Sequence, residues 1–361
     1  MKSLSLEIPW NIKSTLALGA DMKRSFALGE NRQITLFYSR KPLSTVEEAL
    51  DFKEEVLGEI KRRGFQPRVV VGDLHPRYLS TRTARELHPD PVLVQHHRAH
   101  IASALAEHGI TEEVIGISMD GTGYGEDGGV WGGEFFVGEV EELTRVGHIE
   151  YFPLQGGDSA ARETWRPALA LIDLISPERA EKMAAEIGPR AKVVLAALRK
   201  GLGVVPTSSA GRLFDAAAFL ILGIRENSYE AEAPMALEKA GSSCPSAPPY
   251  RFALREDGEK LLLDPLPAFE EILTRKESPE RMALSFHRGL ARGIAEVAFK
   301  LRERTGIKKL VFSGGVFQNN LLTGLLKEEA KNAGFEPVFH RRVPAHDGGI
   351  ALGQAVLGGL G

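Results

Sequence analysis

Apolar residues gather in short runs that end in glycine or polar residues, a pattern typical of buried strands in an α/β protein. Asn31 separates two of these runs and indicates a hairpin turn. The fourteen residues before the first run form a lead-in. The runs that we predict as strands are residues 15–19, 26–28, 34–38, 68–73, 91–94, 114–119, 130–140, 309–312 and 337–339.

Segments of helical composition separate the strands. Ser44-Thr45-Val46-Glu47 resembles a capping box, which opens a helix that ends at Gly64. Residues 160–240, rich in Ala, Leu, Glu and Arg, are predicted to be mostly helical, and residues 280–304 form another long helix. Glycine, serine and proline collect in residues 241–268, which predicts an irregular segment with short strands.

The same order of elements occurs twice along the chain. A strand, a polar or glycine-bearing loop and two further strands begin at Thr15, and the same series begins again at Val114. The order of elements, and not residue identity, therefore predicts an internal duplication.

Composition and charge narrow the class of protein. The chain has 361 residues, of which 43% are hydrophobic and 26% charged, and these values are ordinary for a globular protein of two or three domains. A formal charge of −3 gives no whole-molecule attraction to nucleic acid. Cys244 is the single cysteine, which excludes an intrachain disulfide and a CxxC zinc module and fits a reducing compartment. Without an apolar run of membrane-spanning length or a signal-peptide core, we expect a cytoplasmic protein with no membrane partner.

The segment Val94–His100 carries three of the ten histidines. His96 and His100 are four residues apart, so on a helix their Cβ atoms lie about 5–6 Å apart on one face. Two imidazoles in this arrangement can share one divalent metal at a strand's carboxyl end. The glutamate of the His-Glu-x-x-His proteases is absent, which argues for a metal that orients a substrate. An ordinary helix start with surface histidines is the alternative, and spacing alone leaves both open.

Three strand ends share one design, in which glycine and small polar residues follow an apolar strand. They are Gly19–Ser25, Asp120–Gly123 and Ser313–Gly315. Such loops let backbone N–H groups approach phosphate oxygens, and a following helix adds partial positive charge. None fits a Walker A loop or a GxGxxG that opens a helix. Asp120 could hold a metal or a water molecule near phosphates, or simply cap its own turn.

Several polar residues outside these loops are further candidates. Asp347, at the mouth of the last helix, could be an oxygen ligand to the same metal or a helix N-cap. Asp215 lies on an apolar helix and needs a partner or a pocket. Arg162 and Arg166 could together bind a carboxylate or phosphate, or form solvated salt bridges. The polar stretch 73–82 lines a cleft or is a solvated loop.

Together, these motifs resemble one known family. The chain is similar to the C-terminal transferase region of the HypF carbamoyltransferases, which mature nickel–iron hydrogenase. The similarity extends from about Leu16 to Gly358, and a more distant one reaches the tRNA threonylcarbamoyladenosine transferases and the O-carbamoyltransferases. The stretches that carry it are residues 73–82, 95–100, 120–125, 131–134 and 313–319.

The resemblance implies an actin/Hsp70/sugar-kinase-like α/β fold. In this fold two ribonuclease-H-like subdomains enclose a central cleft that holds nucleotide and metal. On this chain we expect the lead-in at residues 1–14, the first subdomain at 15–111 and the second at 112–345. The second would contain a helical insertion at about 160–300, and residues 346–361 would form a C-terminal helix that closes the cleft.

The resemblance also implies a site. His96, His100 and Asp347 would be the metal ligands, and two histidines with one aspartate suit Fe²⁺ or Zn²⁺. His96, His100 and Asp120 would be the catalytic residues, and His97 would be dispensable for the metal. Lys23 is the weakest of the candidates for binding the nucleotide, which are Lys23, Asp120, Gly121, Thr122, Gly123, Asp215, Gly314, Gly315 and Asn319.

The implied reaction transfers a carbamoyl group from carbamoyl-adenylate, made from ATP, and leaves AMP. The acceptor would be the C-terminal cysteine of a HypE-type maturation protein, and another domain or protein would supply the adenylate. An O-carbamoyltransferase, a tRNA threonylcarbamoyl transferase-like enzyme, a kinase of the same fold and a non-catalytic ATP-binding regulator are the alternatives.

Two features depart from the family. Full-length members carry an acylphosphatase domain, a cysteine-rich zinc region and an adenylate-forming domain, which a chain of this length does not hold. We therefore expect an excised domain or one half of a split system. The family's Tyr-Glu-Gly-Gln-Ala motif here reads Tyr229-Glu230-Ala231-Glu232-Ala233. Ala231 lacks the backbone freedom of glycine, and Glu232 adds negative charge near the expected nucleotide site.

Overall fold

The computed structural model describes residues 1–361. Its strands are β1 (Lys2–Ala17), β2 (Ser25–Tyr38), β3 (Val69–Asp73), β4 (Val92–Val94), β5 (Val114–Tyr124), β6 (Val130–Gly138), β7 (Thr144–Ile149), β8 (Phe152–Gln155), β9 (Val204–Thr207), β10 (Ala253–Asp257), β11 (Lys260–Asp264), β12 (Lys309–Ser313) and β13 (Glu336–Phe339). Its α-helices are α1 (Val46–Arg63), α2 (Leu79–Leu87), α3 (His96–His108), α4 (Ser159–Arg162), α5 (Trp165–Ile175), α6 (Pro177–Ile187), α7 (Pro189–Arg199), α8 (Ala210–Leu222), α9 (Glu232–Ser242), α10 (Leu266–Thr274), α11 (Pro279–Thr305), α12 (Asn320–Asn332) and α13 (Ile350–Leu360).

Two sheets repeat one strand order. The smaller sheet runs β2-β1-β3-β4, and the larger runs β10-β11-β7-β6-β5-β12-β13, with β8 and β9 attached beside β6. In the first sheet, β1 is antiparallel to β2 and parallel to β3, which is parallel to β4. In the second, β5 is antiparallel to β6 and parallel to β12, which is parallel to β13. This shared topology confirms the internal duplication predicted from element order.

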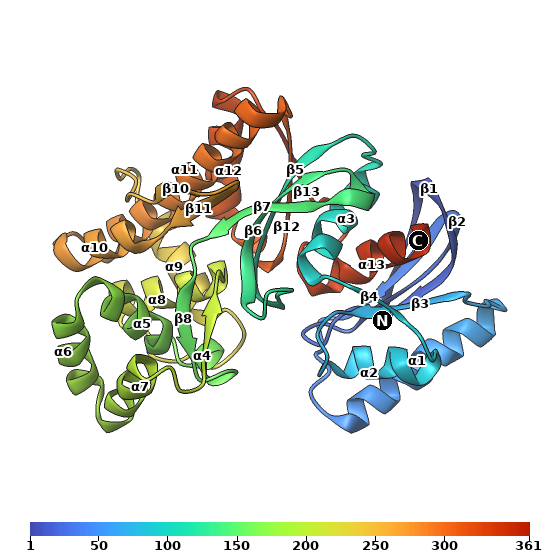
Figure 1. The fold of residues 1–361 in the computed structure, drawn as a ribbon, viewed down its shortest axis with the longest axis horizontal. Helices are drawn as coiled ribbons and strands as arrows, with labels where there is room; N and C mark the ends of the chain where they lie inside the picture. The colour runs from blue at the N-terminus through green and yellow to red at the C-terminus, as the bar shows by residue number, and fades with distance from the viewer.

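Helices α3 and α13 lie between the two sheets (Figure 1). Helix α3 follows β4 of the first sheet but packs on β12 and β5 of the second. Helix α13 follows β13 of the second sheet but packs on β1, β2 and β3 of the first. Their backbones touch, because a Cβ at Gly353 would lie 1.9 Å from the carbonyl oxygen of Ala99. Each sheet is therefore covered by a helix that follows a strand of the other half. We call α3 and α13 the exchanged helices.

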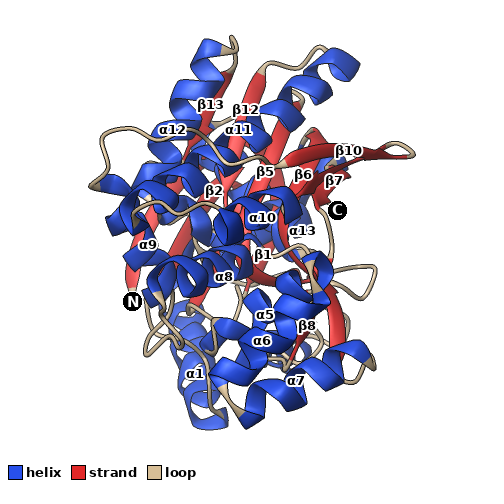
Figure 2. Cartoon of the chain, turned by 90° about the vertical axis from the view of Figure 1, so that its left-hand side faces the viewer, coloured by secondary structure: helices blue, strands red, loops and turns tan.

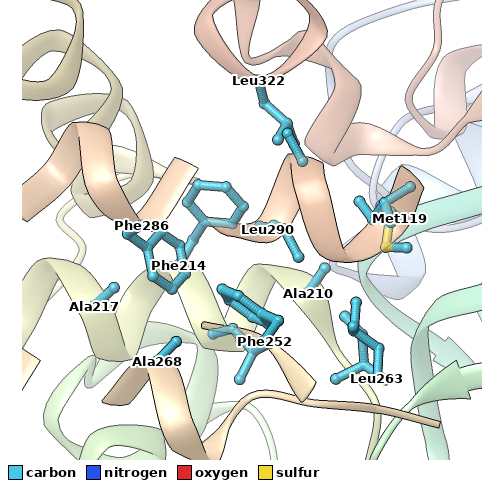
Figure 3. Packing of buried hydrophobic residues seen from close by; sticks show 14 of the residues in the cluster. Met119, Ala210, Phe214, Ala217, Phe252, Leu263, Ala268, Phe286, Leu290 and Leu322 are labelled. Carbon is cyan, nitrogen blue, oxygen red and sulfur yellow. The ribbon is translucent and has the colours of Figure 1, made fainter. Parts of the chain in front are cut away.

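Two large hydrophobic clusters fill the molecule. One, of 29 buried residues, combines side chains of both sheets with those of α3 and α13 and so joins the halves. The other, of 40 residues, lies between the larger sheet and the helices of residues 210–305, which Figure 2 shows in front of its strands. In its interior Phe214, Phe252 and Phe286 point toward one another (Figure 3). No helix of the chain is both long enough and apolar enough to cross a membrane.

The N-terminal strands are longer than predicted. Residues 2–14, expected as a lead-in, form most of β1. The hairpin predicted at Asn31 is wrong: Asn31 lies inside β2, opposite Ile12, at a shift of register. Its φ of 54° is a left-handed conformation that asparagine tolerates, so the residue forms an irregularity within a strand rather than a turn.

The segment Asp120–Gly123 also differs from its prediction. It was expected to be a loop, but it belongs to β5, where the pairing with β6 shifts register between Met119 and Gly123. Glycines weaken a strand and mark such irregularities, which explains why the sequence resembles a loop.

The predicted helices agree better with the structure. Thr45 and Glu48 form the capping box of α1, one residue beyond the predicted pair, and Gly64 ends the helix.

Ala231 precedes α9 in a left-handed conformation, with a φ of 61°. This conformation costs an L-residue with a Cβ about 1–2 kcal/mol and costs glycine almost nothing.

We predict that Ala231→Gly raises the free energy of unfolding by about 1 kcal/mol, because glycine relieves the strain at this position. Urea unfolding followed by circular dichroism measures the change. Ala185→Gly, at an exposed position inside α6, is the matched control and should lower stability by about 1 kcal/mol. Destabilisation by both substitutions would contradict the prediction.

Candidate functional site

The start of α3 holds the two spaced histidines. Gln95 caps the helix, since the backbone N–H groups of His97 and Arg98 donate to its Oε1 at 2.7 and 3.0 Å. The helix begins at His96, so His96 and His100 leave one face, and their ring centroids lie 4.9 Å apart. Both rings are buried, which excludes the alternative of surface histidines.

Two aspartates from other elements meet these imidazoles. Oδ2 of Asp120, in β5, lies 3.3 Å from Nε2 of His96 and 3.2 Å from Nε2 of His100. Oδ1 of Asp347, just before α13, lies 3.6 and 3.5 Å from the same two nitrogens. The four ligand atoms all lie within 4.8 Å of one another, and all four residues are buried. The exchanged helices thus bring both halves of the chain to one point.

The other ring nitrogen of His96 is bound by Asp73, at the end of β3. Nδ1 of His96 lies 2.7 Å from Oδ2 of Asp73, and both side chains are fully buried. A carboxylate in this place keeps the proton on Nδ1 and leaves Nε2 free to bind a metal. Sequence reasoning placed Asp73 only in a polar stretch that either lines a cleft or is a solvated loop, although a polar residue at the end of an apolar strand was the available signal.

The charges of the cluster explain its protonation. Burial alone would lower the pKa of His96, but the carboxylates of Asp73, Asp347 and Asp120 outweigh burial and raise it well above the usual range. Burial also opposes the charged form of His100, whose pKa the bonds to Asp120 and Asp347 raise. Burial would raise the pKa of both aspartates, and the imidazoles lower it instead. Two carboxylates that need positive charge, with two imidazole nitrogens, make a donor set that fits a divalent cation.

A glycine amide orients Asp120. The backbone N–H of Gly315 donates to Oδ1 of Asp120 at 3.1 Å, which leaves Oδ2 toward the histidines. A Cβ at position 315 would lie 2.8 Å from that same Oδ1, so the close approach requires glycine. The N–H of Gly314 is also used within the protein and donates to the carbonyl of Ala345 at 3.0 Å.

The N-terminus of α8 lies against the backbone of β5 at Gly121. The hydroxyl of Ser209, the N-cap of α8, donates to the carbonyl oxygen of Gly121. A Cβ at Gly211 would lie 2.8 Å from the Cα of Gly121, so this contact also needs glycine. Gly121 and Thr122 remain partly exposed at this point, whereas Gly123 is buried against the ring of His97.

Two family models cover most of the chain. Residues 11–107 match the HypF Kae1-like domain, and residues 116–354 match the carbamoyltransferase Kae1-like domain, second subdomain. The chain belongs to the HypF family of carbamoyltransferases. A Cupriavidus necator protein named carbamoyltransferase HypF homolog is 36% identical, with 80% of this chain and 77% of that protein aligned. Carbamoyltransferase HypF2 of the same bacterium is 34% identical over 94% of this chain but only 46% of its own length.

Solved HypF structures share the fold. A crystal structure of full-length HypF in a phosphate- and nucleotide-bound form superposes with a TM-score of 0.91 at 32% identity, covering 98% of this chain and 47% of that one. HypF from T. kodakarensis gives a TM-score of 0.87, also at 32% identity, covering 99% and 48%. The predicted fold class is confirmed. The chain spans about half the length of these two HypF structures.

Three residues that the HypF resemblance assigned to nucleotide lie outside the four-residue cluster. Asp215, buried within α8, pairs with Arg212 at 2.8 Å and accepts a hydrogen bond from Asn227 at 3.0 Å, while burial raises its pKa. Lys23 forms an ion pair with Glu230. Asp215, Lys23 and Asn319 stay predictions as nucleotide contacts, as do the glycine-loop residues.

Arg162 and Arg166 do not act as a pair. The side chain of Arg166 is buried and binds Glu163 and Gln155, whereas the side chain of Arg162 is 60% exposed and 3.6 Å from Glu163. Arg166 therefore satisfies buried groups of the HypF fold rather than forming half of an anion clamp.

Asn319 is held by a buried histidine. Its Oδ1 caps α12 by accepting the N–H of Leu322 at 2.8 Å, and its Nδ2 lies 2.9 Å from Nε2 of His287. Nδ1 of His287 bonds to the carbonyl of Ala283 at 2.8 Å, which leaves Nε2 as an acceptor. Burial lowers the pKa of His287 to about 4.

This lowered pKa predicts a loss of stability in mild acid. The unfolded chain takes up a proton on His287 near pH 6.5, while the folded protein resists it until about pH 4. The contribution of neutral His287 to the free energy of unfolding is complete above pH 6.5. It is lost, to a limit of about 3 kcal/mol, as the pH falls toward 4. Urea unfolding between pH 7.5 and 4.5 should show a flatter pH dependence for His287→Gln than for wild type. Equal slopes would refute the assignment.

The cluster geometry predicts which histidines bind a divalent metal. His96→Ala and His100→Ala should each weaken Zn²⁺ binding at least about 100-fold, because each removes a nitrogen ligand. His97→Gln is the matched control and should stay within a few-fold of wild type, since no His97 atom belongs to the cluster. Isothermal titration with Zn²⁺ measures all three. Equal affinity of His96→Ala and wild type would exclude this metal site.

Proposed function

We propose that this chain transfers a carbamoyl group from carbamoyl-adenylate to the C-terminal cysteine thiolate of a HypE-type maturation protein, releasing AMP. The observation that carries the proposal is the buried cluster of two histidines and two aspartates at the junction of the duplicated halves. Membership of the HypF carbamoyltransferase family supplies the reaction class.

In this proposal His96, His100 and Asp347 bind Fe²⁺ or Zn²⁺, with Asp120 as a further oxygen ligand. The metal, when bound, supplies Lewis-acid polarisation of a phosphate or carbamoyl oxygen. Asp73 holds the ring of His96 and keeps its proton on Nδ1. Gly315 holds Asp120 through its backbone N–H. The chain's part is thus to orient four ligand groups before substrate arrives.

The nucleotide would lie beside this cluster. Gly121 and Thr122 are partly exposed next to the N-terminus of α8, where the helix dipole favours phosphate oxygens. The phosphate- and nucleotide-bound form of a HypF relative supports a nucleotide in this fold. Asp215, Gly314, Asn319 and Lys23 are the candidates for its remaining contacts, and Lys23 would have to leave Glu230 to reach a phosphate.

The reaction needs no nucleophile from this chain. The acceptor thiolate attacks the carbamoyl carbon, a C–S bond forms, and the bond between that carbon and the phosphate oxygen breaks. AMP leaves with the electron pair of the broken bond. Oriented N–H groups and a bound cation near the carbamoyl oxygen would stabilise the charge that develops on it.

The test supplies carbamoyl-adenylate and a HypE-type protein to the Zn²⁺- or Fe²⁺-loaded chain. We expect stoichiometric AMP and a carbamoylated C-terminal cysteine by mass spectrometry, with the rate reduced at least about 100-fold in His96→Ala. A HypE-type protein without its terminal cysteine is the control acceptor. AMP without a modified cysteine would refute the proposed acceptor. A parallel reaction with ATP in place of carbamoyl-adenylate should give no ADP, and ADP formed there would indicate a kinase instead.

A further inference from the structure

A line of buried polar side chains runs from His100 away from the metal cluster. Nδ1 of His100 lies 3.4 Å from the hydroxyl of Ser313, at the end of β12. That hydroxyl lies 2.9 Å from Nε2 of His340, which directly follows β13. Nδ1 of His340 lies 2.6 Å from Oε2 of Glu107, in the last turn of α3. The line therefore starts and ends on the same helix and passes through the ends of two neighbouring strands.

The donors and acceptors along this line can be arranged in only one direction. A carboxylate only accepts hydrogen bonds, so Nδ1 of His340 must carry the ring proton that faces Glu107. The other nitrogen of a neutral His340 is then an acceptor, and it takes the single hydroxyl proton of Ser313. The oxygen of Ser313 is left to accept from Nδ1–H of His100. When His100 gives up its second proton to bind a metal, its free electron pair is therefore on Nε2, which faces the aspartates.

Glu107 is fixed at the far end. The backbone N–H groups of Arg341 and Val343 donate to its Oε1 at 3.0 and 3.1 Å, and that of Arg342 donates to the same oxygen. Burial would raise the pKa of Glu107, but His340 and these amides lower it to about 2. The side chains of His340 and Glu107 are only 4% and 3% exposed, so water does not compete for their bond.

We propose that Ser313, His340 and Glu107 are positioning residues that hold His100 as the tautomer and ring orientation that binds the metal. The inference rests on the proposed metal site. Asp73 orients His96 directly, at 2.7 Å, so the two metal-facing imidazoles of α3 are oriented by different means. Carboxylate support of a ligating imidazole commonly changes metal affinity 10–100-fold.

The experiment titrates Co²⁺ into the purified chain and records both affinity and the visible absorption of the bound ion. Ser313→Ala and His340→Ala should each weaken binding about tenfold and alter the absorption spectrum. The double variant should lose no more Co²⁺ affinity than either single variant, because both substitutions interrupt the same line of hydrogen bonds. His340→Gln keeps an acceptor toward Ser313 and should recover most of the affinity.

His108→Gln is the matched control. His108 lies on the same helix and bonds to the carbonyl of Phe339, at 3.0 Å, but has no link to Ser313. The Co²⁺ affinity and the absorption spectrum of His108→Gln should equal those of wild type. Circular dichroism verifies folding, and His340→Gln remains informative if Ser313→Ala does not fold.

The outcomes distinguish failure of the proposed positioning role from failure of the metal site. If wild type and His96→Ala bind Co²⁺ equally, the metal site itself is wrong. If wild type binds through His96 while Ser313→Ala and His340→Ala keep its affinity and spectrum, the site stands and the positioning role is overturned. Equal losses in His340→Ala and His340→Gln would also overturn it.

Discussion

The carboxylates of Asp120 and Asp347 are buried beside the same two imidazoles, and the molecule must supply positive charge to compensate them. An unpaired buried carboxylate is strongly destabilising, so neither aspartate could occupy this position without His96 and His100. Protons on the imidazoles provide the compensation in the metal-free chain, as their raised pKa values indicate. In the proposed metal site, a divalent cation would supply the same compensation in place of those protons.

The exchanged helices create this concentration of charge. Helix α3 carries the histidines of the first half to β5 of the second, and the segment before α13 carries Asp347 to the same place. The two helices also form the middle of the hydrophobic cluster that joins the sheets. The packing of the halves and the assembly of the site therefore depend on the same helix–helix contact, and a change that separates the two helices would disrupt both.

Local patterns in the sequence predicted the elements better than their connections. The spacing of His96 and His100 was sufficient to predict a shared helix face, and element order was sufficient to predict the duplication. The position of Asp347 before the last helix left it open as a metal ligand or a helix N-cap, and only the family resemblance favoured the ligand, because its contact with α3 spans more than two hundred residues. His340 was not a candidate, and Asp73 and Ser313 were named only as members of a polar stretch and a glycine loop. The roles of these side chains depend on neighbouring strand ends that lie side by side in the fold. Asn31 was misread because a left-handed asparagine looks the same in a turn and in an irregular strand.

The contact between Gly353 and Ala99 has a consequence for how such a chain could arise. Half of this molecule, made alone, would hold a helix without the sheet that it covers and a sheet without its helix. Two identical halves could satisfy one another only by trading those helices across a two-fold axis, as in a domain-swapped dimer. The single chain has that geometry, with one of the two helices carrying the histidines and the other following an aspartate.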